Sequence, residues 1–315
     1  MRLARLLPRI WPLLLLAWAP AAASSEAGDA GFDLQEVAPG IHVHHGRHEL
    51  PRAQNHLDIA NIGFIVGERC VAVIDPGGSR YVARRLRAAL RRVTDRPVCY
   101  VIDTHVHADH LLGNAVFREK GVTFIGHEGL PDALLSNEEF FTRQFIEPMG
   151  EGGGPDYFVV PDHLVKIGEP MRIDLGNREL VLQAWPKSHT GSDLTVYDPG
   201  TRTLWAADLL FMERIPPLEG SLKGWLAVLD ELEKIPARQV VPGHGPVIAP
   251  WPAALAPERR YLSILLEETR EAVAEGLSLQ EALERVGYSE RENWVLFDDV
   301  HGRNVTRAYT ELEWE

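Results

Sequence analysis

Residues 104–110 read Thr-His-Val-His-Ala-Asp-His and hold three imidazoles and one carboxylate. The run before them, residues 98–102, is apolar and rich in β-branched side chains, which predicts a strand buried on both faces. The ligand-type side chains would then emerge at the C-terminal end of a strand, where open α/β sheets bind ligands. They are His105, His107, Asp109 and His110. Imidazole and carboxylate suit zinc, iron or manganese better than calcium or magnesium, so we interpret the cluster as half of a two-metal site.

Three later positions supply the same kinds of side chain, each directly after an apolar run. His189 stands in Ser-His-Thr-Gly, Asp208 follows residues 203–207, and His244 lies between two glycines after Val240-Val241. A single histidine or aspartate after a strand is more typical of an ordinary turn residue. Together with the first cluster, however, these three would complete two metal shells, so we expect each of them in a turn that follows a strand.

These motifs resemble the metallo-β-lactamase superfamily over residues 36–250, in order and approximate spacing. The segments that carry the resemblance are Ile-Asp75-Pro-Gly-Gly, His105-x-His107-x-Asp109-His110, His189, Asp208 and Pro-Gly-His244-Gly. The resemblance implies an α/β (α+β) fold, a four-layer αββα sandwich with metals at one rim of its two sheets. One departure from the family pattern is Lys187-Ser188, where relatives commonly have glycine.

The resemblance also implies a role for each ligand. It assigns the first metal to His105, His107 and His189, the second to Asp109, His110 and His244, with Asp208 as the bridge. Asp75 would brace the metal loop from behind, as bound metal sites require. The implied cofactor is two zinc ions, with iron and manganese as alternatives.

Residues 220–225 and 303–315 resemble the exported SoxH-like group, also called quinoprotein relay system zinc metallohydrolases. That likeness implies a small-molecule substrate and a quinoprotein dehydrogenase as a partner. The leading hypothesis for the reaction is attack of a metal-activated hydroxide on a carbonyl carbon in a thioester, ester or lactone. Asp109 would orient this nucleophile and carry the proton afterwards.

Three other functions are alternatives to carbonyl hydrolysis. A class B type β-lactamase is disfavoured because lactam-cleaving relatives usually have Cys or Ser at the position of Asp208. A mononuclear iron persulfide dioxygenase uses similar ligands. A non-hydrolytic, metal-binding accessory protein of a dehydrogenase is the third alternative.

The first 23 residues have the pattern of a secretory signal peptide. Arg2, Arg5 and Arg9 precede an apolar run at residues 10–18, and Ala21-Ala22-Ala23 offers a cleavage site. The apolar run is too short to span a bilayer comfortably, so we expect a secreted or periplasmic protein with no membrane span after cleavage. Loss of those three arginines takes the formal charge from −13 to −16. Such an acidic chain is a poor partner for nucleic acid.

The predicted organisation continues with a linker at residues 24–35 and a catalytic domain at residues 36–250. Residues 129–161, Leu- and Phe-rich and then Gly-rich, are interpreted as an insertion or lid. Residues 251–315 form a helical extension packed on the domain. The elements predicted within this frame are a strand at 37–45 broken at Pro39-Gly40, strands at 62–66 and 70–75, and helices beginning at Ser79, Asp109 and Ser221. The helix from Asp109 is expected to reach Phe117.

Several residues outside the ligand set carry further expectations. Cys70 and Cys99 would form a disulfide in an oxidising compartment or remain two buried thiols, and both alternatives stay open. Histidines crowd residues 42–56, and in relatives this hairpin loop overhangs the metals. His48 and His56 are therefore candidates for substrate contact, with surface histidines or incidental metal binders as the alternative. A triad of Ser188, His189 and Asp193 is disfavoured because groups so close in sequence seldom converge. Three tryptophans of the C-terminal part are expected to anchor the core: Trp251, Trp294 and Trp314.

Overall fold

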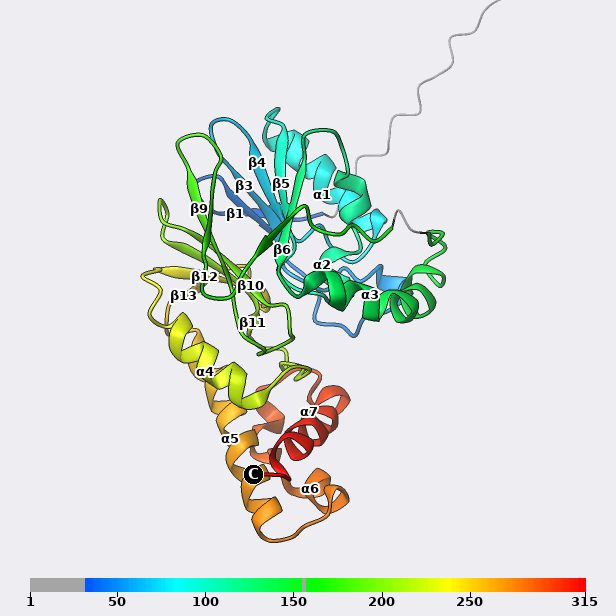
Figure 1. The fold of residues 1–315 in the computed structure, drawn as a ribbon, viewed down its shortest axis with the longest axis vertical. Helices are drawn as coiled ribbons and strands as arrows, with labels where there is room; N and C mark the ends of the chain where they lie inside the picture. The colour runs from blue at the N-terminus through cyan, green and yellow to red at the C-terminus, as the bar shows by residue number, and fades with distance from the viewer. Residues whose placement is uncertain (1–31, 155–156) are drawn as a thin grey trace, which may run out of the picture. The chain divides into compact units, whose positions relative to one another are not determined.

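The computed structural model describes residues 32–154 and 157–315, and two facing sheets organise them (Figure 1). Within these residues the first sheet has seven strands in chain order. They are β1 (Leu34–Ala38), β2 (Ile41–His44), β3 (Ile62–Val66), β4 (Val71–Ile74), β5 (Val98–Ile102), β6 (Thr123–His127) and β7 (His163–Val165). β1 to β4 form the expected antiparallel meander, and β4 to β7 run parallel. The β5 strand, which was expected to carry the metal loop, lies between β4 and β6.

Two features of this sheet differ from the sequence prediction. The strand predicted at 37–45 is broken at Pro39-Gly40 as expected, but the break is the turn of a hairpin between β1 and β2, because Gly40 adopts a φ of 70° that reverses the chain. β6 was not predicted at all. Its short apolar run, residues 123–127, lies between two turns and carries no alternation of apolar and polar residues that would mark a strand.

The described residues of the second sheet form six strands in the order β13-β12-β11-β10-β9-β8. Their bounds are β8 (Met171–Asp174), β9 (Glu179–Ala184), β10 (Leu194–Asp198), β11 (Thr203–Phe211), β12 (Gln239–His244) and β13 (Ala249–Pro250). β11 and β12 are parallel and the other pairs antiparallel. Buried side chains from both sheets, such as Ile74 and Ile102 from one and Val196 and Trp205 from the other, form one cluster between them. The two sheets therefore share a core.

Helix α1 (Arg80–Val93) covers the outer face of the first sheet. Ser79 caps it, since the hydroxyl accepts a hydrogen bond from Val82 N at 3.2 Å. Leu86 and Leu90 lie in a buried cluster with residues of the first sheet. The cap and this apolar stripe were predicted, whereas the last residue of the expected stripe, Val93, is exposed.

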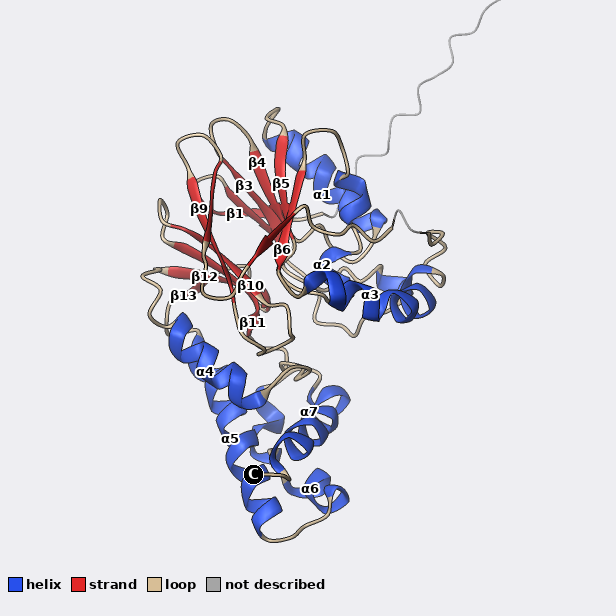
Figure 2. Ribbon diagram, in the orientation of Figure 1, coloured by secondary structure: helices blue, strands red, loops and turns tan. Residues whose placement is uncertain are grey.

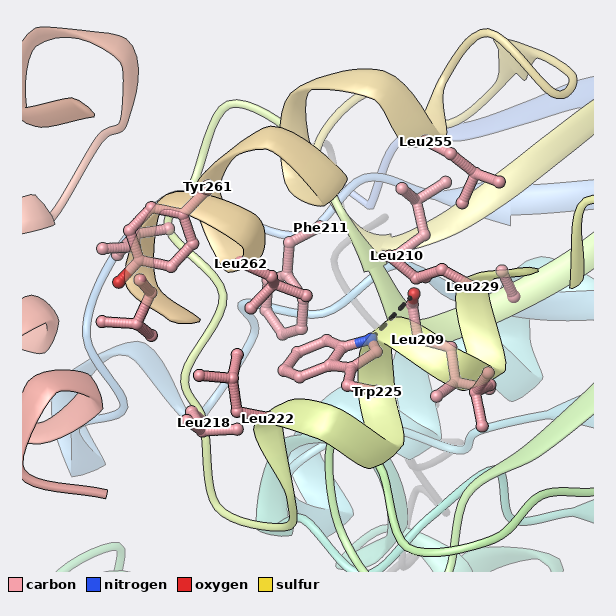
Figure 3. Packing of buried hydrophobic residues seen from close by; sticks show 14 of the residues in the cluster. Leu209, Leu210, Phe211, Leu218, Leu222, Trp225, Leu229, Leu255, Tyr261 and Leu262 are labelled. Atoms are coloured by element: carbon pink, nitrogen blue, oxygen red, sulfur yellow. Dashed lines mark hydrogen bonds between the residues drawn. The ribbon is translucent and has the colours of Figure 1, made fainter. Parts of the chain in front are cut away.

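Helices α4 (Leu222–Leu232) and α5 (Leu255–Ala274) cover the outer face of the second sheet. Figure 3 shows the indole of Trp225 lying between β11 and α5, where it donates a hydrogen bond to the carbonyl of Leu209 at 3.3 Å. The layers are thus helix, sheet, sheet and helix, with helices drawn on the outer side of each sheet in Figure 2. This architecture confirms the predicted αββα fold class.

The C-terminal helices continue this outer layer. α5 packs with α7 (Phe297–Leu312), while α6 (Leu279–Arg285) and the 3₁₀ segment η4 (Tyr288–Asn293) lie between them in the chain. A capping box of Ser278 and Glu281 opens α6. Trp251 and Trp294 are buried, but Trp314 is 87 % exposed. The expectation of a core anchor at Trp314 was wrong because that residue follows the end of α7, beyond the packed helices.

Residues 129–161 begin with α3 (Leu130–Phe141) and one π-helical turn, η3 (Thr142–Ile146). Phe141 and Phe145 belong to a buried cluster beneath this segment. Farther along, the Glu151 carboxylate accepts hydrogen bonds from the backbone N–H groups of Arg80 and Tyr81 at 2.8 and 3.0 Å. The glycine-rich stretch is therefore tied through Glu151 to the N-terminus of α1, where a negative charge is favourable.

Cys70 and Cys99 form a disulfide between the start of β4 and β5, with Cα atoms 5.7 Å apart. This settles the alternative that the sequence left open. The predicted signal peptide at residues 1–23 and most of the linker lie outside the described residues. In the part of the chain that the structure does describe, Phe32–Glu315 group as one compact unit and no helix is both long and apolar enough to cross a bilayer.

Candidate metal centre

The loop after β5 brings the first histidine cluster to the C-terminal end of the first sheet. Backbone contacts fix this loop, since Leu194 N donates to the Thr104 carbonyl at 2.8 Å and so joins it to the second sheet. The helix expected from Asp109 to Phe117 was wrong in its extent. α2 (Ala108–Leu111) is a single turn, because Gly113 N donates to the Gly77 carbonyl at 2.8 Å rather than continuing the helix. A separate 3₁₀ turn, η2 (Asn114–Phe117), follows.

The side chains that the resemblance assigns to the first metal converge with Asp208. One ligand atom from each of His105, His107, His189 and Asp208 lies within 4.8 Å of all the others. His107 Nδ1 is 3.1 Å from His189 Nε2. Asp208 Oδ2 is 3.5 Å from His105 Nε2 and 3.4 Å from His189 Nε2. The group offers three nitrogens and one carboxylate oxygen to a common point.

Asp109, His110 and His244 form the second group by the same measure. Asp109 Oδ2 lies 3.4 Å from His244 Nε2 and 3.8 Å from His110 Nε2. Asp208 also faces this group, with Oδ1 3.1 Å from His110 Nε2 and Oδ2 3.4 Å from His244 Nε2. A single buried carboxylate thus lies between the two groups, at the position expected of a bridge.

Asp208 does not stand in a turn after a strand, as the sequence suggested, but inside β11. The register between β11 and β12 shifts on both sides of Ala207, which has a φ of 47°. This bulge turns the Asp208 side chain toward the centre, a common use of bulges beside active sites. The opposite strand must lack a side chain there, because a Cβ on Gly243 would lie 1.9 Å from Asp208 Oδ1. His244 is then the last residue of β12.

Asp75 holds the second group from behind. Its Oδ2 lies 2.9 Å from His110 Nδ1, and Thr104 donates to the same carboxylate from its backbone N–H at 2.9 Å and its hydroxyl at 2.8 Å. Asp75 is fully buried. With Nδ1 engaged in this way, His110 presents Nε2 to the centre, which is how outer carboxylates orient metal-binding histidines.

Two further side chains contact the ligands and were missed by sequence reasoning. Glu219 Oε2 is 2.9 Å from His107 Nε2, and Arg214 Nη1 is 2.9 Å from His244 Nδ1. Both belong to the connection between β11 and α4, in which the Pro217 carbonyl also lies 2.9 Å from His189 Nδ1. Glu219 and His107 are separated by 112 positions, and no local pattern marks such a contact. The one available signal was nearness to residues 220–225, which carry part of the subgroup resemblance.

The charged groups of the centre shift one another's pKa values. Burial lowers the pKa of His107, but the Glu219 carboxylate outweighs it, with help from Asp109 and Asp208, and raises the pKa to about 9. The charge of His107 in turn lowers the pKa of Glu219 to about 2. Burial raises the pKa of Asp208, yet the surrounding imidazoles, His110 foremost, hold it well below the usual range. The centre therefore favours bound positive charge.

The residues present fit divalent metal ions. His105 Nε2 is buried, points toward Asp208 and has no hydrogen-bond partner among the described residues. Leaving such an atom unpaired is costly unless something binds it. The donor set of imidazole nitrogens and carboxylates is the one that zinc and similar cations prefer. Each half of the site provides at least three such donors.

A pocket of about 200 Å³ opens over the ligands. Its walls come from the loop after β2, from α3 and η3, from the β11–α4 connection and from α7. The loop after β2 contributes Leu50 and Pro51, whereas His48 and His56 are not among the lining residues. His48 lies near Glu213 at 3.8 Å and His56 packs on the Tyr81 ring at 4.4 Å between centroids. The structure thus does not bring these two histidines into the pocket.

Ser188, His189 and Asp193 do not form a hydrolase triad. Ser188 Oγ donates directly to Asp193 Oδ2 at 2.7 Å, and His189 Nδ1 faces the Pro217 carbonyl instead. His189 is therefore not placed to act as the base for Ser188. His189 packs instead on Trp225, with ring centroids 5.0 Å apart, and His244 stacks on Phe211 at 4.9 Å. The core under the second sheet thereby orients one imidazole of each ligand group.

Comparison with known proteins agrees with this geometry. Residues 57–244 match the family model described as the metallo-beta-lactamase superfamily. A linear primary-alkylsulfatase of Pseudomonas sp. (strain ATCC 19151) is 22 % identical over 238 residues, which cover 64 % of this chain and 43 % of the relative. The chain thus spans less than half the length of that curated relative.

Two solved structures illustrate the likeness in fold. The sec-alkylsulfatase Pisa1 from Pseudomonas sp. has a TM-score of 0.68 at 20 % identity, covering 88 % of this chain and 49 % of that one. A metallo-beta-lactamase from Pontibacter korlensis has a TM-score of 0.59 at 18 % identity, covering 73 % of this chain and 98 % of that one. Because the family match spans more than half of the chain, the protein belongs to the metallo-beta-lactamase superfamily.

Proposed function

We propose that the protein is a binuclear zinc hydrolase that cleaves a carbonyl-centred bond in a thioester, ester or lactone. The observation that carries this proposal is the position of Asp208, whose carboxylate lies within 3.5 Å of imidazole nitrogens from both ligand groups. A carboxylate shared in this way suits two cations rather than one. Two cations close together are suited to stabilising both the attacking and the leaving group of a hydrolysis.

When bound, the two cations would lower the pKa of a water and polarise the scissile carbonyl. The chain's own contribution begins with Asp109, which lines the pocket beside His244. Asp109 would orient the attacking water and accept its proton. Glu219 and Asp75 fix the rings of His107 and His110, so that little rearrangement is needed during the reaction.

The pocket walls would limit the entry of further water. Val106, Phe141 and Phe145 are buried side chains beside the ligands, and Leu50 and Phe140 add to the apolar part of the lining. A site of this composition suits a substrate with an apolar segment next to the cleaved bond. Exclusion of water would also strengthen the electrostatic interactions of the centre.

Hydrolysis of a sulfate ester is the second candidate. It is favoured by the alkylsulfatase relatives and by the buried guanidinium of Arg214 in the pocket, since arginine binds tetrahedral oxyanions well. A mononuclear iron dioxygenase is a weaker candidate, because a single metal would leave one of the two ligand groups without a cation.

We also propose that the protein acts outside the cytoplasm, beside a quinoprotein dehydrogenase. Support comes from the signal-peptide pattern of residues 1–23 and from the Cys70–Cys99 disulfide, a bond that persists in oxidising compartments. The likeness of residues 220–225 and 303–315 to the SoxH-like group supports the choice of partner. Co-purification of the native chain with a dehydrogenase that holds pyrroloquinoline quinone is the direct test of this association.

The reaction is tested with a substrate panel on zinc-loaded protein: a thioester, a carboxylic ester, a lactone, an alkyl sulfate and a β-lactam. We expect turnover of a carbonyl substrate that is lost on chelation and in His107→Ala. His163→Ala, which changes an exposed histidine of the edge strand β7, is the matched control and keeps activity. Turnover of the alkyl sulfate alone would replace the leading proposal by the second. A metal-loaded protein that hydrolyses nothing but binds a dehydrogenase would be an accessory protein.

A further inference from the structure

Arg214 is a buried cation, and most of its N–H donors have no hydrogen-bond partner among the described residues. The residue is 6 % exposed, and its Nε is buried with no partner among the described residues. It forms no ion pair with a described carboxylate, and its side chain contacts His244 through Nη1, which lies 2.9 Å from His244 Nδ1. Guanidinium carries five N–H donors and no acceptor, so a buried arginine in this condition is energetically expensive.

The contact with His244 cannot satisfy Arg214 when metal is bound. His244 Nε2 faces Asp109 and Asp208, the position of a metal ligand, so Nδ1 must carry the ring hydrogen. That hydrogen has an acceptor in the Ile59 carbonyl, 2.7 Å away. The Nη1–H of Arg214 would then point at another N–H rather than at a lone pair. Among the described residues the guanidinium then has no hydrogen-bond acceptor, and it lines the pocket.

The charges of the loaded centre lead to the same conclusion. Two divalent cations bring four positive charges, against two negative charges from the ligands Asp109 and Asp208. Arg214 adds one more positive charge beside them, whereas Glu219, which pairs with His107, and Asp75, which pairs with His110, offset two. The floor of the pocket is thus net positive, which attracts an anion even though the whole chain has a formal charge of −13.

A second arginine stands at the rim of the same pocket. Arg303 on α7 is exposed and makes no hydrogen bond or ion pair with another described residue. It lines both this pocket and the adjoining groove of about 450 Å³ along α7, which also includes Pro217, Glu219 and Val300. An anion held by Arg214 on the floor would therefore meet a second cation on the way in.

Another part of the pocket lining is apolar. Leu50, Val106, Phe140 and Phe145 line it, and Phe140 is 56 % exposed although it is a large hydrophobic side chain. Phe140 and Phe145 contact each other with ring centroids 5.9 Å apart. An alkyl or acyl chain lying over the exposed face of Phe140 would remove its apolar surface from water.

We propose that the substrate is an anionic amphiphile, with an oxyanion held by Arg214 and Arg303 and an apolar chain along Leu50, Phe140 and Phe145. This inference deepens the proposed hydrolase function and rests on it for the cleaved bond. The oxyanion could be a carboxylate next to a cleaved ester or the sulfate group of an alkyl sulfate, since both accept hydrogen bonds from arginine.

Binding of unreacted ligands tests the proposal without relying on turnover. Zinc-loaded protein is titrated calorimetrically with octanoate, octyl sulfate and 1-octanol. We expect at least one of the two anions to bind about 10-fold or more tightly than 1-octanol, because charge-assisted hydrogen bonds contribute about 1.5–3 kcal/mol each. The tighter anion identifies whether the site prefers a carboxylate or a sulfate. Octyl sulfate is first checked for hydrolysis, and decyl sulfonate replaces it if it is cleaved.

Variants then assign the binding to the two arginines. Arg214→Gln is expected to lower the affinity for the preferred anion by about 10- to 100-fold, and Arg303→Gln by about 3- to 10-fold. The affinity for 1-octanol should not change in either variant. Arg291→Gln is the matched control, because Arg291 is an exposed arginine of η4 that pairs with Asp298 on α7. We expect this variant to leave anion affinity unchanged. Zinc content is measured for each variant, so that loss of metal is not mistaken for loss of the arginine contact.

Two results would overturn the proposal: equal affinity for octanol and both anions, or anion binding that persists unchanged in Arg303→Gln and in Arg214→Gln. If Arg214→Gln does not fold, the exposed Arg303→Gln variant and the octanol comparison still decide. Failure of every hydrolysis assay with arginine-dependent anion binding would refute the proposed hydrolase function alone. Carbonyl hydrolysis with no arginine dependence of binding would refute the substrate class alone.

Discussion

The two ligand groups have different kinds of support. The second group rests on the buried core: Asp75, which holds His110, is fully buried between β4 and the metal loop. The first group rests on a surface connection, since the Glu219 side chain that holds His107 is 59 % exposed. One half of the centre is thus fixed by the sheet and the other by a loop.

The connection that supports the first group is itself held by the C-terminal helices. On α7, Asn304 accepts a hydrogen bond from Leu218 N at 2.8 Å and donates to the Pro216 carbonyl at 2.7 Å. Arg307 donates to the Glu219 carbonyl from the same helix. The loop that supports His107 and His189 is therefore held by a helix distant in sequence. We expect the first metal to be the more weakly and variably bound of the two.

The largest effect is expected at the residue common to both groups. Asp208→Asn keeps the shape of the side chain but removes the charge that faces four imidazoles, so both metals should bind more weakly. Zinc content after dialysis should fall below one equivalent, and kcat/KM on the best substrate should fall by about 10³-fold or more. Retention of two tightly bound zinc ions in this variant would contradict the bridging role.

Asp75→Asn removes the support that the buried core gives to the second ligand group. His110 would lose the carboxylate that orients it, so affinity for the second metal should fall by about 10- to 100-fold. The first metal should stay bound. Competition titration with a chromogenic chelator resolves the two affinities, and equal weakening of both would show that the groups are not supported independently.

Glu219→Gln tests the surface support in the same way. We expect about a 10-fold weaker first metal and an unchanged second metal, because only His107 loses its charged partner. Glu213→Gln, at another exposed glutamate of the same connection, is the matched control. An equal response to Glu213→Gln would mean that general surface charge, rather than the contact with His107, sets the affinity.

The smallest effect concerns the core beneath the second sheet. Burial raises the pKa of Glu258 well above its usual value, while its Oε1 accepts a hydrogen bond from Phe211 N at 2.9 Å. When folding raises the pKa of a carboxyl group, the protein becomes less stable as the pH rises above the pKa of that group in the unfolded chain, about 4.3. The unfolding free energy of Glu258→Gln relative to the parent should therefore rise by about 1 kcal/mol or more between pH 5 and pH 8. Urea titrations at both pH values measure this difference, and a flat difference would contradict the buried-acid assignment.

Much of this arrangement could be predicted because its signals are local. The strand before His105 and the spacing of the next three ligands mark one sheet edge, and Ser79 and Ser221 mark two helix starts within a few residues. The family resemblance then supplied the αββα layers and the partners of the first cluster.

The remaining features depend on contacts that local sequence does not encode. The bulge at Ala207 places Asp208 inside β11 instead of after it, and it exists because Gly243 on the neighbouring strand leaves room. Glu219 and Arg214 reach ligands far away along the chain, so neither has a pattern of its own. The pocket lining likewise replaces the expected His48 and His56 with Leu50 and Pro51, because the loop after β2 turns its histidines toward Glu213 and Tyr81.

The most direct test of a binuclear centre with unequal support is a metal count on the parent protein beside its two support variants. Protein freed of metal, reconstituted with excess zinc and dialysed should retain two zinc ions per chain by inductively coupled plasma mass spectrometry. After partial chelation we expect Glu219→Gln to keep the second zinc and Asp75→Asn to keep the first. One zinc per chain in the parent protein, or a single iron after purification without added metal, would contradict the binuclear centre.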